Sequence, residues 1–374
     1  MHMKLLLPGL LAFSLVSAQK KPYLIIGTYT SGKSEGIYVY SFDTRSAENK
    51  LISVAKTSNP SYLAVSPNKK TLYAVNENAD TTGSVIGGAV TAFSFNAATG
   101  KLTAMNTQLS GGTNPCYVSV DKSGKWVFAG NYSSGTLAVF PVKNGDAINP
   151  SSQVIAESGT GPNIQRQEGP HVHATVLSPD NKYLFVPNLG SDKIMIYSIN
   201  QTTGKLAPAT EKFVSKEPGS GPRHLDFAPN KKYAYLMEEL SGNVIAYRYD
   251  DGRLKQIQSI SCLQKDFTGV VGAADIHVSH DGKFLYCSNR GDANLITIFS
   301  IDPKDGKLTV AGYQSTLGKT PRNFNFDPTG NFLLVANQES DNIVIFKIDR
   351  KTGLLTDTGK RILVPNPVCV KWIE

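Results

Sequence analysis

Residues 169–206 of this 374-residue chain read GPHVHATVLSPDNKYLFVPNLGSDKIMIYSINQTTGKL, and a fold can be inferred from their pattern. Residues 173–177, 183–187 and 193–199 are rich in Val, Ile, Tyr and Phe and place apolar side chains at every second position, which is typical of β-strands. A fourth run begins at Leu206. Turn formers separate these runs, with Ser-Pro-Asp-Asn at 178–181 and Thr-Thr-Gly-Lys at 202–205. The stretch therefore predicts four consecutive antiparallel strands.

The same pattern recurs along the whole chain. Full copies begin with a small or polar residue followed by Pro or Ala, at Asn59-Pro60, Asn114-Pro115, Gly169-Pro170, Gly221-Pro222, Gly272-Ala273 and Thr320-Pro321. A truncated seventh copy begins at Asn366-Pro367, and successive copies start between 46 and 55 residues apart. A repeat of about 50 residues with four antiparallel strands is the signature of a β-propeller blade.

The two ends of the chain complete each other. The chain begins with three strands, at residues 23–27, 36–42 and 51–55, which lack the first strand of a blade. It ends with a single strand, at residues 368–373, which lacks the other three strands of a blade. Pairing them in one blade removes two exposed sheet edges. The sequence thus predicts an all-β, seven-bladed propeller with four antiparallel strands per blade, formed as a single domain by residues 19–374.

Residues 1–18 are expected to be a signal peptide. Lys4 precedes the apolar run 5–16, and Val16-Ser17-Ala18 offers small residues for cleavage after Ala18. We therefore expect an exported protein, periplasmic or secreted. Export permits disulfides. We nevertheless expect four buried free thiols, and one disulfide among them is the alternative: Cys116, Cys262, Cys287 and Cys369.

The net charge of +8 does not indicate nucleic-acid binding. The lysines are scattered through turns such as 68–70 and 230–232, without a basic stripe or interleaved aromatic residues. No later apolar run approaches the ~18 residues that span a bilayer, so no membrane contact is expected after signal removal. We expect a monomer whose partner is a small molecule.

Residues in equivalent positions of the blades can be aligned by counting from the turn after each first strand. The inner ring, in the first strands, is Ser61, Cys116, His173, Arg223, Ala274 and Arg322. An asparagine ring ends the second strands, at Asn76, Asn131, Asn188, Glu238, Asn289 and Asn337. The rim ring consists of the residues one position after each member of the asparagine ring, at Glu77, Tyr132, Leu189, Glu239, Arg290 and Gln338.

The irregular charge in two of these rings indicates a site. Asparagine at the end of a strand can satisfy the backbone hydrogen-bonding groups of the following turn, so we interpret the asparagine ring as structural. A structural role should repeat from blade to blade. Neither the inner ring nor the rim ring has one residue type that is shared by its members from blade to blade. The ionisable side chains of the inner and rim rings gather on one face of the propeller, which indicates a functional site. The alternative is that they form structural ion pairs.

A metal centre is not expected. His171 and His173 lie on one strand face and resemble a ligand pair. No third ligand has a clear spacing, and two arginines at the same place would repel a cation. We expect neither metal nor cofactor. The insertion 158–168, which carries Arg166, is read as part of the site's rim or as a loose surface loop.

Several short motifs together resemble the lactonase family of seven-bladed propellers, which includes propeller-type 6-phosphogluconolactonases and the carboxy-muconate lactonising enzyme. They are Arg166-Gln167, Pro170-His171-Val172-His173, Gly221-Pro222-Arg223-His224, Glu239-Leu240, Ala274-Asp275-Ile276-His277 and Asn289-Arg290. The resemblance covers residues 23–374 and implies that the catalytic residues are His173, Glu239, Arg223 and Arg290.

The expected function is hydrolysis of a sugar-type lactone at the central face. Glu239 or His173 would act as base with the other as proton donor, and Arg223 and Arg290 would hold the oxyanion. The expected substrate-binding residues are His171, Arg322, Glu77, Gln338 and Arg166. The alternatives are a non-catalytic propeller that binds an anionic sugar, and the reverse, lactonising reaction. An exported protein would not meet the phosphorylated sugar lactone of the cytosol.

Overall fold

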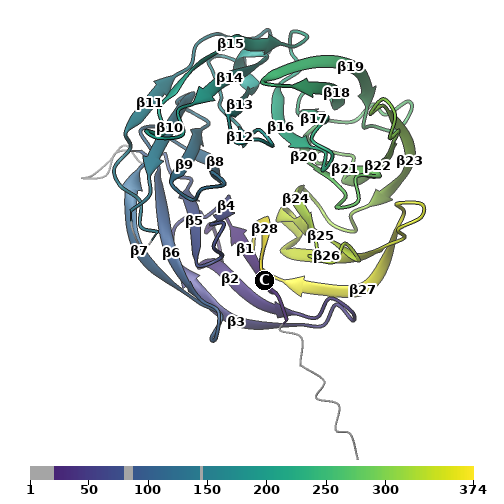
Figure 1. The fold of residues 1–374 in the computed structure, drawn as a ribbon. Helices are drawn as coiled ribbons and strands as arrows, with labels where there is room; N and C mark the ends of the chain where they lie inside the picture. The colour runs from purple at the N-terminus through teal and green to yellow at the C-terminus, as the bar shows by residue number, and fades with distance from the viewer. Residues whose placement is uncertain (1–20, 80–86, 144–145) are drawn as a thin grey trace, which may run out of the picture.

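The computed structural model describes residues 21–79, 87–143 and 146–374, so the expected signal peptide at residues 1–18 lies outside the described residues. Seven four-stranded antiparallel sheets stand around a common axis as the blades of a propeller (Figure 1). This confirms the predicted fold class. Among the described residues, no helix is long and apolar enough to cross a membrane.

Six blades are built from consecutive strands, ordered from the axis outward. The first three of these blades are β4 (Leu63–Val65), β5 (Thr71–Asn76), β6 (Ala89–Asn96) and β7 (Lys101–Leu109); β8 (Pro115–Val120), β9 (Trp126–Asn131), β10 (Thr136–Pro141) and β11 (Gln153–Ala156); β12 (Val176–Leu177), β13 (Tyr183–Asn188), β14 (Lys193–Ile199) and β15 (Leu206–Ser215). The next three are β16 (Pro222–Phe227), β17 (Tyr233–Glu238), β18 (Asn243–Asp250) and β19 (Arg253–Ser261); β20 (Ala273–Val278), β21 (Phe284–Asn289), β22 (Leu295–Ile301) and β23 (Leu308–Ser315); β24 (Pro321–Phe326), β25 (Phe332–Asn337), β26 (Asn342–Ile348) and β27 (Leu355–Leu363). Two short 3₁₀ helices, η1 (Leu189–Ser191) and η2 (Gln338–Ser340), follow β13 and β25.

The seventh blade joins the two ends of the chain. It consists of β28 (Pro367–Ile373) at the axis, then β1 (Tyr23–Thr28), β2 (Gly36–Phe42) and β3 (Asn49–Lys56). β28 pairs with β1 antiparallel, with Tyr23 opposite Ile373 and Gly27 opposite Cys369. The predicted closure is therefore confirmed, and the strand next to the axis in this blade comes from the other end of the chain.

The core lies between neighbouring blades. The second strands β5, β9, β17, β21 and β25 are buried at every position, because each lies between the sheets on both sides. The outermost strands are largely exposed, as in β7. Burying both faces explains why the second strands read as nearly continuous apolar runs.

One predicted strand is shorter than expected. The sequence predicts a strand over residues 173–177, but β12 covers only Val176–Leu177, with an isolated bridge between Val172 and Asn188. Pro187 on the facing strand has no N–H to donate, so one hydrogen bond of this strand pair is absent. Its carbonyl still accepts a hydrogen bond from the backbone N–H of His173 at 3.0 Å.

The asparagine ring has the structural role expected of it. The side-chain amides of Asn76, Asn131 and Asn337 donate to the carbonyls of Ser58, Ser110 and Thr316, at 2.7, 2.9 and 3.1 Å. Each acceptor lies in the connection that leads into the same blade. These hydrogen bonds hold in place the segments that connect consecutive blades, on the face of the propeller that carries the site.

The four cysteines are buried and free, which agrees with the default reading of the sequence: Cys116, Cys262, Cys287 and Cys369.

Removing β28 is predicted to open the ring. Val368, Val370 and Ile373 are buried, and each such side chain contributes roughly 1.5–3 kcal/mol. Their sum is comparable with the whole stability of a typical domain, about 5–15 kcal/mol. Deletion of residues 367–374 should abolish soluble, cooperatively melting protein, whereas deletion of the exposed Glu374 alone should not. A truncated protein that melts like the full chain in calorimetry would contradict ring closure by β28.

Candidate active site

A pocket of about 230 Å³ opens at the end of the axis where the first strands begin. Its lining combines three arginines, two glutamates, two tyrosines, a histidine and a cysteine, namely Tyr29, Glu77, Cys116, Tyr132, Arg166, His173, Glu239, Arg290 and Arg322. Six of these were predicted from the sequence as catalytic or substrate-binding residues. Polar side chains that converge in a concave site are the usual mark of a binding or catalytic centre.

The register of the blades explains why these residues meet. In an antiparallel hairpin the start of one strand lies beside the end of the next, and Pro222 at the start of β16 pairs with Glu238 at the end of β17. The inner-ring residue Arg223 and the rim-ring residue Glu239 therefore lie at the same end of their blade. Repetition in other blades brings both rings to one face.

Glu239 is the centre of the charged cluster. Its Oε1 accepts from Arg166 Nη2 at 2.6 Å, and its Oε2 accepts from Arg223 Nε at 2.8 Å and lies 3.1 Å from Arg290 Nη2 in an ion pair. Burial alone would raise the pKa of Glu239, but Arg290, Arg223 and Arg166 hold it well below its usual range. Glu239 is therefore an ionised carboxylate at neutral pH and has no proton to donate.

His173 lies beside this carboxylate in the neutral form. Its Nε2 is 3.9 Å from Glu239 Oε2, and its Nδ1 is 3.7 Å from Cys116 Sγ. Burial lowers the pKa of His173 well below its usual range, and Arg223 and His224 act in the same direction. A neutral imidazole on the wall of a pocket can accept a proton from a bound water.

The arginines of the site have two different environments. Arg166, Arg223 and Arg290 share Glu239, and burial lowers the pKa of Arg290 to about 10, so it keeps its charge at neutral pH. Arg322 instead lies over the ring of Tyr29 at 5.3 Å and makes no ion pair with any described residue. It therefore offers hydrogen-bond donors to a ligand.

The insertion 158–168 forms part of the rim rather than a loose loop. Gln167 is buried, and its side-chain amide donates to Asp192 Oδ1 at 2.8 Å and to the Leu189 carbonyl at 2.9 Å. This anchor holds the neighbouring Arg166 against Glu239. Arg166 is 41% exposed, so it lies between the pocket and solvent.

Three predicted residues lie outside the pocket wall. Arg223 lies directly beneath it and reaches the pocket through Glu239. His171 stacks on Tyr132 with ring centroids 4.3 Å apart and bonds the Tyr132 carbonyl through Nδ1 at 2.9 Å, so it supports the wall from behind. Gln338 does not line the pocket, because the chain turns there into the 3₁₀ helix η2.

Sequence reasoning missed the tyrosines of the site. Tyr132 stood in the rim ring without a role. Tyr29 was not in any ring, because its blade is divided between the two ends of the chain. It directly follows β1 as Glu77 follows β5, and its hydroxyl donates to Glu77 Oε2 at 2.9 Å. The count begins at the turn between the first two strands of a blade, and in the shared blade these strands, β28 and β1, come from opposite ends of the chain.

The described residues contain no group of three or more His, Cys, Asp or Glu side chains placed to hold a metal ion. His171 Nε2 lies 3.3 Å from Glu168, and His173 faces Glu239 and Cys116, so the two histidines have separate partners.

Fold and site together define a seven-bladed propeller with a cationic pocket at one end of its axis. The family model described as "Lactonase, 7-bladed beta-propeller" matches residues 23–372. The chain belongs to this family, as its motifs indicated.

Relatives of similar length match over nearly the whole chain. A Bacillus subtilis protein named 6-phosphogluconolactonase is 40% identical over 93% of this chain and 97% of its own length. One of the same name from Formosa agariphila is 39% identical, over 91% and 96%. The solved structure of the Pseudomonas aeruginosa periplasmic gluconolactonase is similar with a TM-score of 0.89 and 39% identity, covering 94% of this chain and 99% of that one.

The environment of His173 predicts a pH dependence of stability. In the unfolded chain a histidine titrates near pH 6.5, whereas burial holds the pKa of folded His173 well below that value. As pH falls below about 6.5 the unfolded state binds more protons, so the free energy of unfolding falls. His173→Asn should flatten this dependence by up to one proton, about 1.4 kcal/mol per pH unit.

Urea unfolding of wild type and His173→Asn between pH 8 and 4.5 measures this difference. The values at pH 8 give the effect of the substitution itself, because His173 is neutral in both states there. If the free energies of unfolding of wild type and His173→Asn changed with pH in parallel below pH 6.5, folded His173 would bind a proton as readily as the unfolded chain does.

Proposed function

We propose that the protein is a hydrolase that opens a sugar-type lactone in the central pocket. The observation that carries this proposal is a neutral imidazole, His173, 3.9 Å from a carboxylate that three arginines hold ionised. Ester hydrolysis requires a base for water, donors for the oxyanion and an acid for the leaving alkoxide. The pocket offers a group for each requirement.

His173 is proposed to perform both proton transfers. Its Nε2 accepts a proton from water as the water oxygen attacks the lactone carbonyl carbon. When the ring C–O bond breaks, the resulting imidazolium returns that proton to the leaving alkoxide. The low pKa of Glu239 supports this assignment over one in which Glu239 is the acid. The ionised carboxylate stabilises the transient imidazolium.

The arginines are proposed to divide two tasks. Arg290 lines the pocket, and its guanidinium is oriented by Glu239 and by the Gly272 carbonyl, which accepts from Nε at 3.1 Å. An oriented donor of this kind suits the charge that develops on the carbonyl oxygen. Arg322, which has no ion pair within the described chain, suits an anionic substituent of the substrate.

The protein is proposed to act after export, with a signal peptide at residues 1–18 cut after Ala18. The basic start, the apolar run 5–16 and the small residues before the cut support this, as does the relative described as a periplasmic gluconolactonase. Sequencing the N-terminus of protein isolated from its host should find Gln19 first; a retained Met1 would contradict export by cleavage.

A small substrate panel tests the reaction class. Gluconolactone, its 6-phosphate and a lactone without sugar hydroxyls are each incubated with the protein, and acid release is followed by pH-stat. Faster opening of a sugar lactone than in buffer supports the hydrolase. Binding of the product acid without turnover would favour the non-catalytic reading, and ring closure of the acid would favour the lactonising one.

Arg290→Met should separate catalysis from stability. The variant leaves Glu239 with Arg166 and Arg223, so the melting temperature should change little, whereas loss of an oxyanion donor should lower kcat by about 10²–10³-fold. The matched control is Arg361→Met, which breaks a surface ion pair with Asp357 on the outer strand β27 and should keep full turnover. A well-folded Arg290→Met enzyme with normal kcat would show that Arg290 does not stabilise the oxyanion.

A further inference from the structure

The pocket has a second wall that the proposed chemistry does not use. His173 and Glu239 belong to the neighbouring blades β12–β15 and β16–β19. Tyr29, Glu77 and Arg322, which we call the far wall, belong to the shared blade and its two neighbours, β4–β7 and β24–β27, on the other side of the axis (Figure 1). A lactone whose carbonyl faces His173 therefore turns the opposite side of its ring toward the far wall.

The far wall combines hydrogen-bond acceptors with hydrogen-bond donors. The Tyr29 hydroxyl donates to Glu77 Oε2 at 2.9 Å, so the proton of this hydroxyl is used within the wall. A carboxylate has about four lone-pair sites, so Glu77 has the capacity to accept further hydrogen bonds. Arg322 lies over the face of the Tyr29 ring, 5.3 Å from its centroid, and a guanidinium has only donors. A ligand at this wall thus meets an acceptor and a donor on one tyrosine.

Hydroxyl groups match this combination, because a hydroxyl both donates and accepts. One hydroxyl donates to Glu77, while the oxygen of its neighbour accepts from Arg322. A carboxylate or phosphate oxygen accepts from Arg322 as well, but it is repelled by the negative charge of Glu77 when placed beside it. A methylene group has no hydrogen bond to offer, and it would leave the polar groups of the wall without partners once it displaced water from them.

We propose that the far wall is a subsite for substrate hydroxyl groups: Glu77 accepts a hydrogen bond from a hydroxyl on the ring carbons across from the lactone carbonyl, and Arg322 binds the oxygen next to it. Tyr29 is a positioning residue that orients the Glu77 carboxylate. This inference rests on the proposed hydrolase function for its kinetic consequence. It narrows the substrate class to lactones that carry hydroxyls on carbons 3 or 4 of a six-membered ring. Where an anionic substituent occupies Arg322, Glu77 takes the hydroxyl beside it.

Glu77→Met should lower the preference for hydroxylated lactones. Gluconolactone is compared with δ-valerolactone, which has the same ring without hydroxyls. The variant should lose about 10–100-fold in kcat/KM for gluconolactone, the usual effect of losing a hydrogen bond to a charged group, and should keep its rate on δ-valerolactone. The matched control is Glu339→Met, which removes an exposed carboxylate from η2, outside the pocket, and should leave both rates unchanged. Equal losses on the two lactones in Glu77→Met would overturn the proposal.

Deoxy substrates test which hydroxyl contacts Glu77. Wild type and Glu77→Met are compared on gluconolactone and on its 2-, 3- and 4-deoxy derivatives. Removing the 3- or the 4-hydroxyl should lower kcat/KM in wild type and cause no further loss in Glu77→Met, because the two changes remove the same hydrogen bond. Removing the 2-hydroxyl, beside the carbonyl, should affect both proteins equally. Additive losses for every derivative would overturn the proposed contact.

Tyr29→Phe provides a milder second variant, in case Glu77→Met fails to fold. It removes one hydroxyl and keeps the ring beneath Arg322, so the carboxylate remains but loses its orienting donor. We expect a loss of about 2–10-fold in kcat/KM for gluconolactone, with the rate on δ-valerolactone unchanged. A purely structural role of Tyr29 would lower both rates by the same factor, and that result would contradict its role as a positioning residue.

Binding of the product acids separates the two proposals. If wild type opens no lactone, the hydrolase function is wrong, and calorimetry with gluconate and with 5-hydroxypentanoate, the acid of δ-valerolactone, still tests the subsite. Tighter binding of gluconate by wild type, with the difference reduced in Glu77→Met, would support the hydroxyl subsite. Equal affinities of wild type for the two acids would overturn it.

Discussion

The antiparallel pairing of β28 with β1 closes the ring and sets the position of every blade. β28 pairs with β1, so the first and last segments of the chain share one blade and every first strand faces the same axis. His173, Arg223 and Arg290 lie on three different blades and have no local reason to meet. Equal register around a closed ring brings them to one end of the axis, His173 and Arg290 on the pocket wall and Arg223 beneath it. An open ring would leave sheet edges unpaired and the site dispersed.

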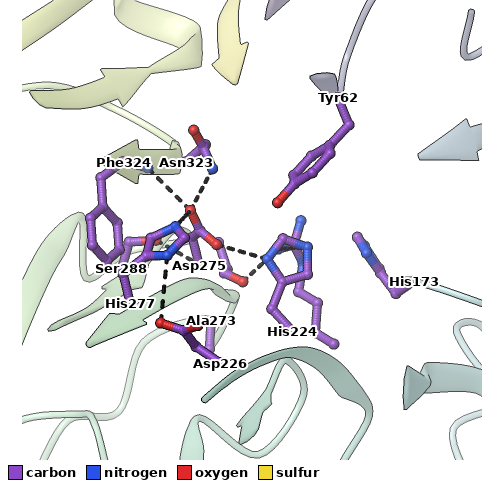
Figure 2. A network of polar contacts seen from close by, with 12 residues as sticks. Tyr62, His173, His224, Asp226, Ala273, Asp275, His277, Ser288, Asn323 and Phe324 are labelled. Atoms are coloured by element: carbon purple, nitrogen blue, oxygen red, sulfur yellow. Dashed lines mark hydrogen bonds and ion pairs between the residues drawn. The ribbon is translucent and has the colours of Figure 1, made fainter. Parts of the chain in front are cut away.

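The second constraint is electrostatic. Three arginines gathered at one place repel each other, and burying them requires a counter-charge. Glu239 supplies it, and its contacts with the arginines keep the carboxylate ionised. Burial, with Arg223, lowers the pKa of His173 and leaves that ring neutral. Beneath the pocket, Arg223 Nη1 lies over the ring of His224, 3.2 and 3.4 Å from its two nitrogens, and His224 Nδ1 lies 2.8 Å from Asp275 Oδ1 (Figure 2). The protonation states that the proposed chemistry uses follow from this arrangement.

The repeat predicted the architecture almost completely, because alternation, turn residues and copy spacing are local properties of the chain. Counting within each copy also found His173, Glu239 and Arg290, since register carries over from blade to blade. It could not find Tyr29, whose blade is divided between the chain ends, or the shortening of β12 opposite Pro187. It read His224 and His277 as ordinary packed or turn residues. The contact of His224 with Asp275 runs between blades, whereas His277 and Asp275 lie two residues apart on β20.

His173 is proposed to carry the proton in both steps of lactone opening, and chemical rescue of a variant without the imidazole examines this role. His173→Gly leaves a space the size of an imidazole beside Glu239 and should lose about 10²–10⁴-fold in kcat. Free imidazole should restore part of that rate in proportion to its concentration, and it should not accelerate wild type to the same degree. A His173→Gly protein that folds and opens lactones at the wild-type rate without imidazole would contradict the account.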